Sequence, residues 1–257
     1  MNEPHEEILR GLLVIDKEPG FTSMDVCAIV RRKLRRGGAP KRVKVGHGGT
    51  LDPLATGVLV VLVGKATPLC NVIMVGRKEY VAKVDLARIS TSDDLGGVVT
   101  DVAVRAPLTR EVVEHALTAF VGKIQQRPPD FSAMHVGGVR AYQLARRGET
   151  PMLSDREVHV HEIETIAYEW PTLTIRVLSG KGVYIRSIAR DLGRALGVGG
   201  LLSSLRRTRV GEFTIERALT LGALPDQLDQ KDLILVPESL TVAAQKNLSP
   251  GEPQPNE

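Results

Sequence analysis

The sequence has very little cysteine and no long apolar run. Its 257 residues include only Cys27 and Cys70, which lie far apart and form no C-x-x-C motif. This pattern argues against a disulfide framework, fits a reduced cytoplasm, and offers no zinc-ligand spacing. The longest apolar run, residues 58–63, is far too short to cross a bilayer, and the acidic start MNEPHEE is unlike a secretory signal. We therefore expect a soluble, cytoplasmic protein with no membrane association.

Positive charge is in slight excess and unevenly distributed. The formal net charge is +4, and residues 31–44 carry eight basic side chains and no acid. We interpret this segment as a loop. A basic loop is either a solvated surface feature or a contact for a phosphate backbone, and the composition leaves both interpretations open.

The hydrophobic pattern predicts an α+β fold, with a mixed, largely antiparallel sheet flanked by helices and loops. The predicted strands are 11–16, 58–63, 79–86, 157–163 and 173–178. The predicted helices are 24–33 (capped at Thr22 or Ser23), 108–121 and 184–196. Residues 124–152 interrupt this rhythm and predict an insertion with a short helix at 141–147. We expect an extension at 1–10, one catalytic domain at 11–236, and a flexible tail at 237–257.

Three short segments allow more than one interpretation. In 46–57, Asp52 before Pro53 is typical of a helical start, and spacing alone favours such a structural cap over chemistry. His159 and His161 share a strand face, where exposed histidines are commoner than a metal site. The glycine-rich turn at 179–186 leads into a helix, and it is either an anion site or a plain connection. Residues 64–67 resemble the end of a phosphate-binding loop, but Leu59 stands where that loop has its earlier glycine, and Ala66 stands where it has a hydroxyl residue. We therefore reject nucleotide binding there.

Several motifs occur in order between about residues 12 and 213. They are VIDKEPGFTS at 14–23, VGHGGTLDPLATGVLVV at 45–61, GKAT at 64–67, KEYVAKVDL at 78–86, QQRPPDFSAMHVGGVRAYQLARRGE at 125–149, GVYIRSIARDLG at 182–193 and LRRTRVGEF at 205–213. With these motifs the chain resembles the TruB family, bacterial synthases that make pseudouridine at position 55 in the T-loop of tRNA. One motif would be weak evidence, but this many in order is highly specific.

The resemblance implies a reaction and the residues that perform it. Asp52 matches the catalytic aspartate, Tyr80 the ring that holds the detached base, and Arg186 the arginine that favours the ionised aspartate. The isomerisation involves no net oxidation or group transfer, so it implies neither a metal nor another cofactor. The residues implied to bind the substrate nucleotide are His47, Gly49, Thr50, Asp94, Tyr184 and Leu205.

The implied partner is the T-stem-loop of tRNA, bound by a monomer with no obligate protein partner. The basic segment and the insertion would contact the RNA backbone through Arg31, Arg32, Arg35, Arg36, Lys41, Arg42, Lys44, Arg127, Arg140 and Arg146.

The sequence departs from the family pattern at several places. The usual H-T-G is His47-Gly48-Gly49 here, and the S-A-L-K of the insertion ends in His135. The T-D-T-x-D loop keeps only its last acid, Asp94. Too few apolar residues follow residue 213 to build the C-terminal RNA-binding PUA domain that bacterial members usually carry.

Two other functions fit the same motifs. The first is an RNA-binding or RNA-folding protein in which catalysis is secondary, and the second is the same chemistry on another RNA, as in the guide-dependent ribosomal enzymes. The intact set of Asp52, Tyr80 and Arg186 argues against a loss of catalysis. The guide-dependent enzymes carry a PUA domain and need partner proteins, so we favour the tRNA enzyme over them as well.

Overall fold

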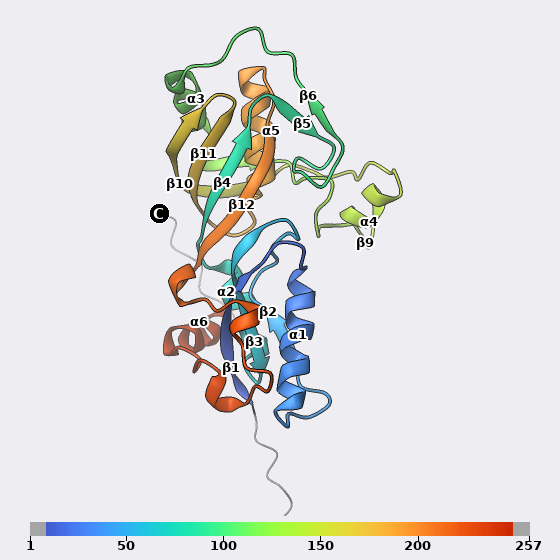
Figure 1. Cartoon of the computed structure of the whole chain (residues 1–257), viewed down its shortest axis with the longest axis vertical. Helices are drawn as coiled ribbons and strands as arrows, with labels where there is room; N and C mark the ends of the chain where they lie inside the picture. The colour runs from blue at the N-terminus through green and yellow to red at the C-terminus, as the bar shows by residue number, and fades with distance from the viewer. Residues whose placement is uncertain (1–8, 249–257) are drawn as a thin grey trace, which may run out of the picture. The chain divides into compact units, whose positions relative to one another are not determined.

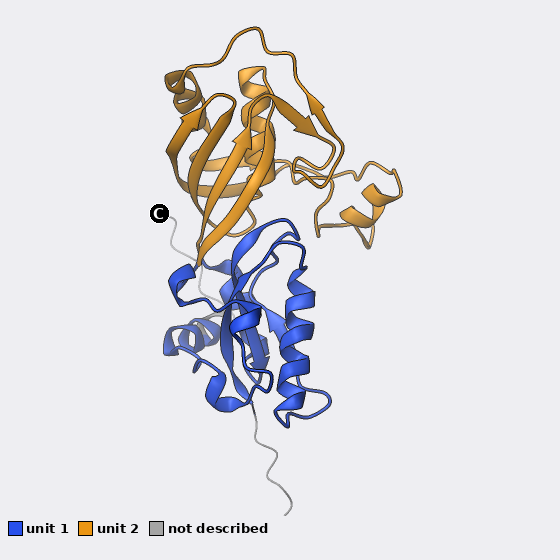
Figure 2. Cartoon of the chain, viewed as in Figure 1, with its two compact units in different colours: residues 1–76, 210–257 blue, residues 77–209 orange. Residues whose placement is uncertain are grey.

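The structure, a computed structural model, describes residues 9–248 and divides into two compact units. Unit 1 comprises residues 1–76 and 210–257, and unit 2 comprises residues 77–209 (Figure 2). Each unit has its own hydrophobic core. The limits of the predicted catalytic domain, 11–236, stay a prediction, but the chain inside them forms two compact parts rather than one.

Unit 1 is built on the antiparallel pair β1 (Arg10–Lys17) and β3 (Thr56–Gly64), with the short strand β2 (Val45–His47) also paired to β3. Helix α1 (Ser23–Arg36) packs on one face of these strands, and helices α2 (Cys70–Val75) and α6 (Glu238–Leu248) pack on the other (Figure 1). Since both faces are covered, the side chains of β3 are buried whichever way they point. This explains the uninterrupted apolar run at 58–63.

The remainder of unit 1 consists of short elements. These are the 3₁₀ turns at Thr67–Leu69, Ile215–Arg217, Leu221–Ala223 and Gln230–Asp232 and the strand β13 (Phe213–Thr214). Backbone bridges join Ile15 to Leu219 and Leu12 to Ile234. The segment after residue 213 therefore closes over β1 and helps to bury it.

Unit 2 contains an antiparallel series of strands in the order β12 (Leu201–Val210), β4 (Lys78–Asp85), β11 (Thr172–Ser179), β10 (Arg156–Glu169) and β7 (Gly122–Gln126). Helices α3 (Arg110–Leu117) and α5 (Ile185–Leu196) pack on it, and α3 continues into a 3₁₀ turn at Thr118–Phe120. Two small hairpins complete the unit. They are β5 (Arg88–Ser90) with β6 (Val99–Asp101), and β8 (His135–Val136) with β9 (Val139–Arg140), which leads into α4 (Ala141–Arg146) (Figure 1).

The predicted α+β class and antiparallel sheet are confirmed, as is the start of α1. Thr22 caps that helix: its Oγ1 accepts the Asp25 amide at 3.1 Å, and the Asp25 carboxylate accepts the Thr22 amide at 2.8 Å. Several predicted boundaries are wrong, and the strand predicted at 157–163 continues to Glu169. Helix α1 continues to Arg36, so the first part of the predicted basic loop is helical. Residues 124–126 pair with β10 as part of β7, so they belong to the sheet and not to the insertion. Residues 238–248 form α6, where a flexible tail was predicted, and the tail residues 249–257 lie outside the described part.

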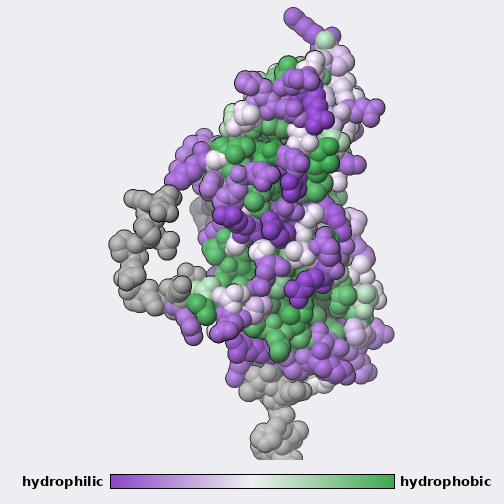
Figure 3. Space-filling model, turned by 90° about the vertical axis from the view of Figure 1, so that its left-hand side faces the viewer, coloured by the Kyte–Doolittle hydropathy of each residue, from purple (hydrophilic) through white to green (hydrophobic). Residues whose placement is uncertain are grey.

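No helix within residues 9–248 is long and apolar enough to span a bilayer. On the face drawn in Figure 3, polar side chains separate several apolar patches.

Candidate functional site

The loop that carries Asp52 is fixed on both sides of this residue. Before it, the Leu51 amide donates to Ser23 Oγ at 2.9 Å, and Ser23 Oγ donates to the Leu51 carbonyl at 3.2 Å. After it, the Pro53 carbonyl accepts the Gly20 amide at 2.8 Å and Lys17 Nζ at 3.1 Å. Asp52 itself is half-buried, and its carbonyl accepts the Ala55 amide at 3.1 Å. Asp52-Pro53 therefore begins a tight turn and not the predicted helix, and the position of this turn is set by residues 17–23.

Lys17 is the buried centre of these contacts. Its side chain is fully inaccessible, and besides Pro53 its ammonium donates to the carbonyls of Glu18 and Phe21, each at 2.9 Å. Hydrogen bonding to several acceptors is what a charged group needs when it leaves water. The ammonium thereby joins the end of β1 to the loop of Asp52.

Two glycines before Asp52 are needed for packing or for backbone conformation: Gly48 leaves no room for a side chain, and Gly49 has a positive φ. A Cβ on Gly48 would lie 2.3 Å from Ile73 Cγ2 of helix α2, far closer than packed carbon atoms approach. Gly49 has a φ of 130°, which side chains disfavour. His47 lies half-buried at the end of β2 opposite Val61, and Thr50 is exposed. Gly48, a departure from the family pattern, thus leaves room for a large neighbour.

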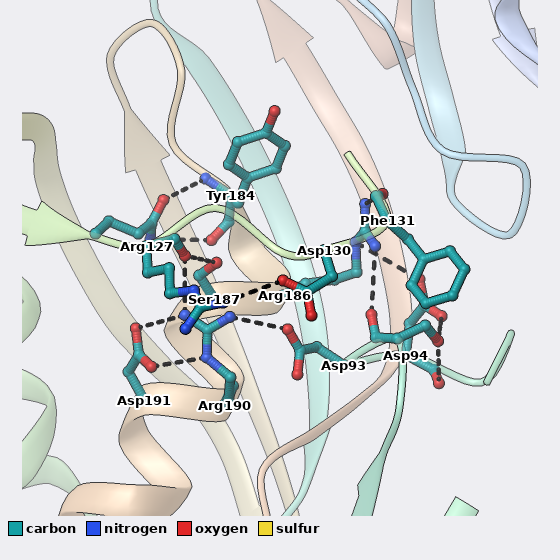
Figure 4. Close-up of polar contacts among 12 residues, drawn as sticks. Asp93, Asp94, Arg127, Asp130, Phe131, Tyr184, Arg186, Ser187, Arg190 and Asp191 are labelled. Carbon is teal, nitrogen blue, oxygen red and sulfur yellow. Dashed lines mark hydrogen bonds and ion pairs between the residues drawn. The ribbon is translucent and has the colours of Figure 1, made fainter. Parts of the chain in front are cut away.

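In unit 2, Arg186 lies in the first turn of α5 and is held by two separate segments (Figure 4). Its Nη1 donates to the Ser92 carbonyl at 3.3 Å, its Nη2 donates to the Phe131 carbonyl at 3.1 Å, and its Nε lies 3.5 Å from Asp94 Oδ2. Arg186 is almost fully buried, with 4% of the residue exposed. Asp94, which the sequence predicted near the substrate, is therefore an ion-pair partner of Arg186.

Asp94 is oriented by its own loop. Its Oδ1 accepts Ser92 Oγ at 2.6 Å and the Gly96 amide at 2.9 Å, a turn in which the aspartate side chain replaces a backbone acceptor. This leaves Oδ2 to face Arg186. The loss of the other acid of the family pattern, with threonine at position 91, thus leaves the ion pair in place.

Tyr80 and Leu205 belong to the apolar part of unit 2. Tyr80 is 7% exposed, stands opposite Val177 in the pairing of β4 with β11, and contributes to the core cluster. Leu205, on β12, packs partly buried against the same cluster. Close packing in this cluster fixes the ring of Tyr80.

Tyr184 is oriented by a residue that the sequence did not single out. Gln126 is buried at the end of β7, where its Oε1 accepts the Tyr184 amide at 2.8 Å and its Nε2 donates to the Tyr184 carbonyl at 3.1 Å. The Arg156 guanidinium lies 5.0 Å from the centre of the Tyr184 ring. The turn before α5 is thus fixed by β7 and β10, and no local sequence signal marks either contact.

The predicted RNA-contact residues fall into two groups. Some have roles within the protein: Arg31 donates to the Val45 carbonyl at 3.1 Å, Arg35 to the Lys41 carbonyl, and Arg127 pairs with Asp130 at 3.4 Å. The Arg146 guanidinium lies 5.5 Å from the centre of the Tyr142 ring. The other predicted residues are exposed to solvent, namely Arg32, Arg36, Lys41, Arg42, Lys44 and Arg140.

Within the described chain, no cluster of three or more metal-binding side chains is found. His159 and His161 lie together on β10 with ring centres 4.2 Å apart. Burial and the neighbouring His159 lower the pKa of His161.

Comparison with known proteins relates most of the chain to one family. Residues 33–185 match the family model described as TruB family pseudouridylate synthase (N terminal domain), and residues 186–240 match the tRNA pseudouridylate synthase B C-terminal domain. The chain is 43% identical over 219 residues to the tRNA pseudouridine synthase B of Parabacteroides distasonis, covering 85% of this chain and 93% of that protein. It is also 43% identical over 253 residues to that of Thermobifida fusca, covering 94% and 83%.

Among solved structures, a chain of a Cbf5-Nop10-Gar1 complex matches with a TM-score of 0.64 and 33% identity. The match covers 84% of this chain and 53% of that one, so this protein spans about half the length of that relative.

Proposed function

Because the chain belongs to the TruB family of pseudouridylate synthases, we propose that it converts uridine to pseudouridine at position 55 in the T-loop of tRNA. Relatives that cover most of this chain act on tRNA by their names, which supports tRNA as the substrate class. The ordered motifs quoted above support the T-loop position. The reaction is an isomerisation, so its atoms balance without a second substrate.

The proposed chemistry begins at the sugar of the target nucleotide. The N1–C1′ bond must break, the base must turn, C5 must bond to C1′, the C5 proton must leave, and N1 must take up a proton. Asp52 supplies the carboxylate that assists bond cleavage, by attack on the substrate or by removal of a sugar proton. The observation that carries this proposal is the loop geometry: Ser23 holds Leu51 and Lys17 holds Pro53, so that Asp52 stands between two fixed residues. Such rigidity keeps a reacting group in place.

Tyr80 and Arg186 supply the other two functions that the reaction needs. The packed ring of Tyr80 stacks on the base while the base is detached, and it assists loss of the C5 proton. Arg186 supplies a fixed positive charge that favours an ionised carboxylate. Its bonds to two backbone carbonyls and its ion pair with Asp94 hold that charge still.

The target base is stacked in the T-loop, so it must leave the stack before reaction. We propose that His47 occupies the space it vacates, that Gly49, Thr50, Asp94, Tyr184 and Leu205 bind the nucleotide, and that the exposed arginines and lysines of 31–44 and 124–152 contact phosphates. We further propose that the protein works as a monomer in the cytoplasm.

The test is tritium release from unmodified tRNA carrying [5-³H]uridine. We expect release by the wild-type protein and by Asp101→Asn, a matched change at an exposed aspartate of β6. We expect none by Asp52→Asn, with tRNA binding retained, and none when position 55 is cytidine.

Each outcome has a separate meaning. Release by Asp52→Asn at the wild-type rate would refute the role of Asp52. Tight tRNA binding by the wild type without release would refute isomerisation of this substrate and favour RNA folding or another RNA. Release that persists after the change to cytidine would refute position 55 as the target.

A further inference from the structure

A second arginine of helix α5, Arg190, contacts the same two chain segments as Arg186. The two residues lie four apart, about one helical turn. Arg186 binds the carbonyls of Ser92 and Phe131, whereas Arg190 Nη1 binds Asp93 Oδ2 at 3.0 Å and Nη2 binds the Arg127 carbonyl at 2.9 Å (Figure 4). Each of the segments 90–95 and 127–132 therefore contacts α5 at two positions one helical turn apart, Arg186 and Arg190.

The guanidinium of Arg190 is itself held in a fixed direction. Its Nε and Nη2 donate to the two carboxylate oxygens of Asp191, at 2.8 and 3.1 Å. Ser187 Oγ donates to the Arg127 carbonyl at 2.8 Å and shares that acceptor. The side chains of Arg190 and Asp93 are only 13% and 17% exposed, so water screens their ion pair weakly.

Asp93 is in an uncommon backbone conformation. Its φ is 63°, and it is the only residue other than glycine with positive φ among residues 9–248. Its carbonyl accepts the Leu202 amide at 3.0 Å, and its carboxylate meets Arg190. Burial raises the pKa of Asp93, and the charge and hydrogen bond of Arg190 act against this rise. The chain neighbours of Asp93 are Ser92 and Asp94, both of which contact Arg186, so a movement of Asp93 moves both.

We propose that Asp93 and Arg190 form a positioning pair, which holds segments 90–95 and 127–132 on α5 and thereby fixes Asp94 and the guanidinium of Arg186. Neither residue touches the substrate in this proposal. It rests on the proposed function, in which Arg186 takes part in isomerisation.

The test is a double-mutant cycle with Asp93→Asn, Arg190→Gln and the double variant. Asparagine keeps the tolerance of positive φ, so the first change removes charge and not the backbone preference. The single-turnover rate is measured at saturating tRNA, together with the Kd for tRNA and the melting temperature. Arg194→Gln is the matched control, because Arg194 is on the same helix, is exposed, and lies 3.6 Å from Asp191.

We expect each single change to lower the single-turnover rate by about 10- to 100-fold, since misplacing a reacting group by about 1 Å costs on this order. The Kd should stay within about twofold, because these residues hold Arg186 and not the RNA. The double variant should be no slower than the slower single variant. Arg194→Gln should react like the wild type.

Wild-type rates in both single variants would overturn the proposal, as would losses that multiply in the double variant. A weakened Kd with an unchanged rate would overturn it too, because the pair would then serve RNA binding. If Arg190→Gln does not fold, Arg190→Lys is measured instead: it keeps the charge toward Asp93 but cannot reproduce the forked contact, so an intermediate rate is expected and the wild-type rate would overturn the proposal. Absence of tritium release in the wild type would refute the proposed function itself, before any variant is compared.

Discussion

Replacement of Lys17 by methionine should destabilise unit 1 and displace the loop of Asp52. The change keeps an unbranched side chain of similar length in a fully buried place and removes the ammonium. The Pro53 carbonyl keeps its bond from the Gly20 amide, whereas the carbonyls of Glu18 and Phe21 lose theirs from Nζ. A buried polar group left without its partner costs about 1–3 kcal/mol. Because Glu18 lies in an exposed turn where water can replace Nζ, the cost falls mainly on the Phe21 carbonyl, and we expect a net loss of about 1–3 kcal/mol.

The two units allow this loss to be assigned. The only tryptophan, Trp170, packs against the core of unit 2, so its fluorescence reports on that unit. Circular dichroism at the helix band includes α1 of unit 1. In urea titrations, Lys17→Met should shift the circular dichroism transition to lower denaturant concentration, and the tritium-release rate should fall with it.

The control is Lys65→Met, the same change at an exposed lysine of unit 1. Surface changes of this kind stay within about 0.5 kcal/mol. The reasoning would be refuted if Lys17→Met were as stable as Lys65→Met, because the three carbonyl contacts would then contribute nothing net.

Two further predictions follow from close packing and from a buried charge. Gly48→Thr should destabilise the protein by about 1–3 kcal/mol in thermal unfolding, since its Cβ would meet Ile73, and adding Ile73→Ala should restore part of the loss; an unchanged melting temperature for Gly48→Thr would contradict this. Burial, with the charges of Arg207 and Lys181, lowers the pKa of Lys78 from 10.5 to about 8. The unfolded chain therefore binds more protons between these pH values, and the free energy of unfolding should rise with pH there. Between pH 7 and 9 the rise should be about 1.4 kcal/mol larger in the wild type than in Lys78→Met, as measured by urea unfolding, and equal rises in both proteins would contradict it.

The sequence predicted the elements whose signals are local. The cap at Thr22 needs only a hydroxyl and an acid three residues later. The end of α1 was missed because its last turns are dominated by charge, and charge alone has no helical period. Leu34 is nevertheless buried in the core cluster that contains side chains of β1 and β3. Because this apolar contact lies near the end of α1, it stabilises the last turns of the helix. Helix α6 was missed because its apolar face is narrow: Leu240 and Ala244, one turn apart, pack against the cluster that contains Ile73.

The candidate site divides in the same way. Asp52, Tyr80 and Arg186 were found through motifs, which are local strings of residues. The bond of Lys17 to Pro53 joins positions 36 apart, and that of Arg190 to Asp93 joins positions 97 apart. No spacing rule reaches across such separations, because the fold decides which segments meet. Motifs therefore predict the candidate reacting groups, and only the structure shows which residues hold them in place.

Lys17 and Arg186 place a buried cation by the same physical means. Each donates to backbone carbonyls from more than one segment: Lys17 to Glu18, Phe21 and Pro53, and Arg186 to Ser92 and Phe131. A carbonyl cannot change rotamer as a side-chain carboxylate can, so the cation is satisfied only while the segments keep their places. If a segment moves, a buried charge loses a partner, which costs several kcal/mol. The buried cations of Lys17 and Arg186 therefore stabilise the positions of the segments that they contact, and these segments in turn fix the positions of the cations. In the proposed reaction, this mutual constraint supplies preorganisation, because the loops and the charge are already in place when the protein has folded.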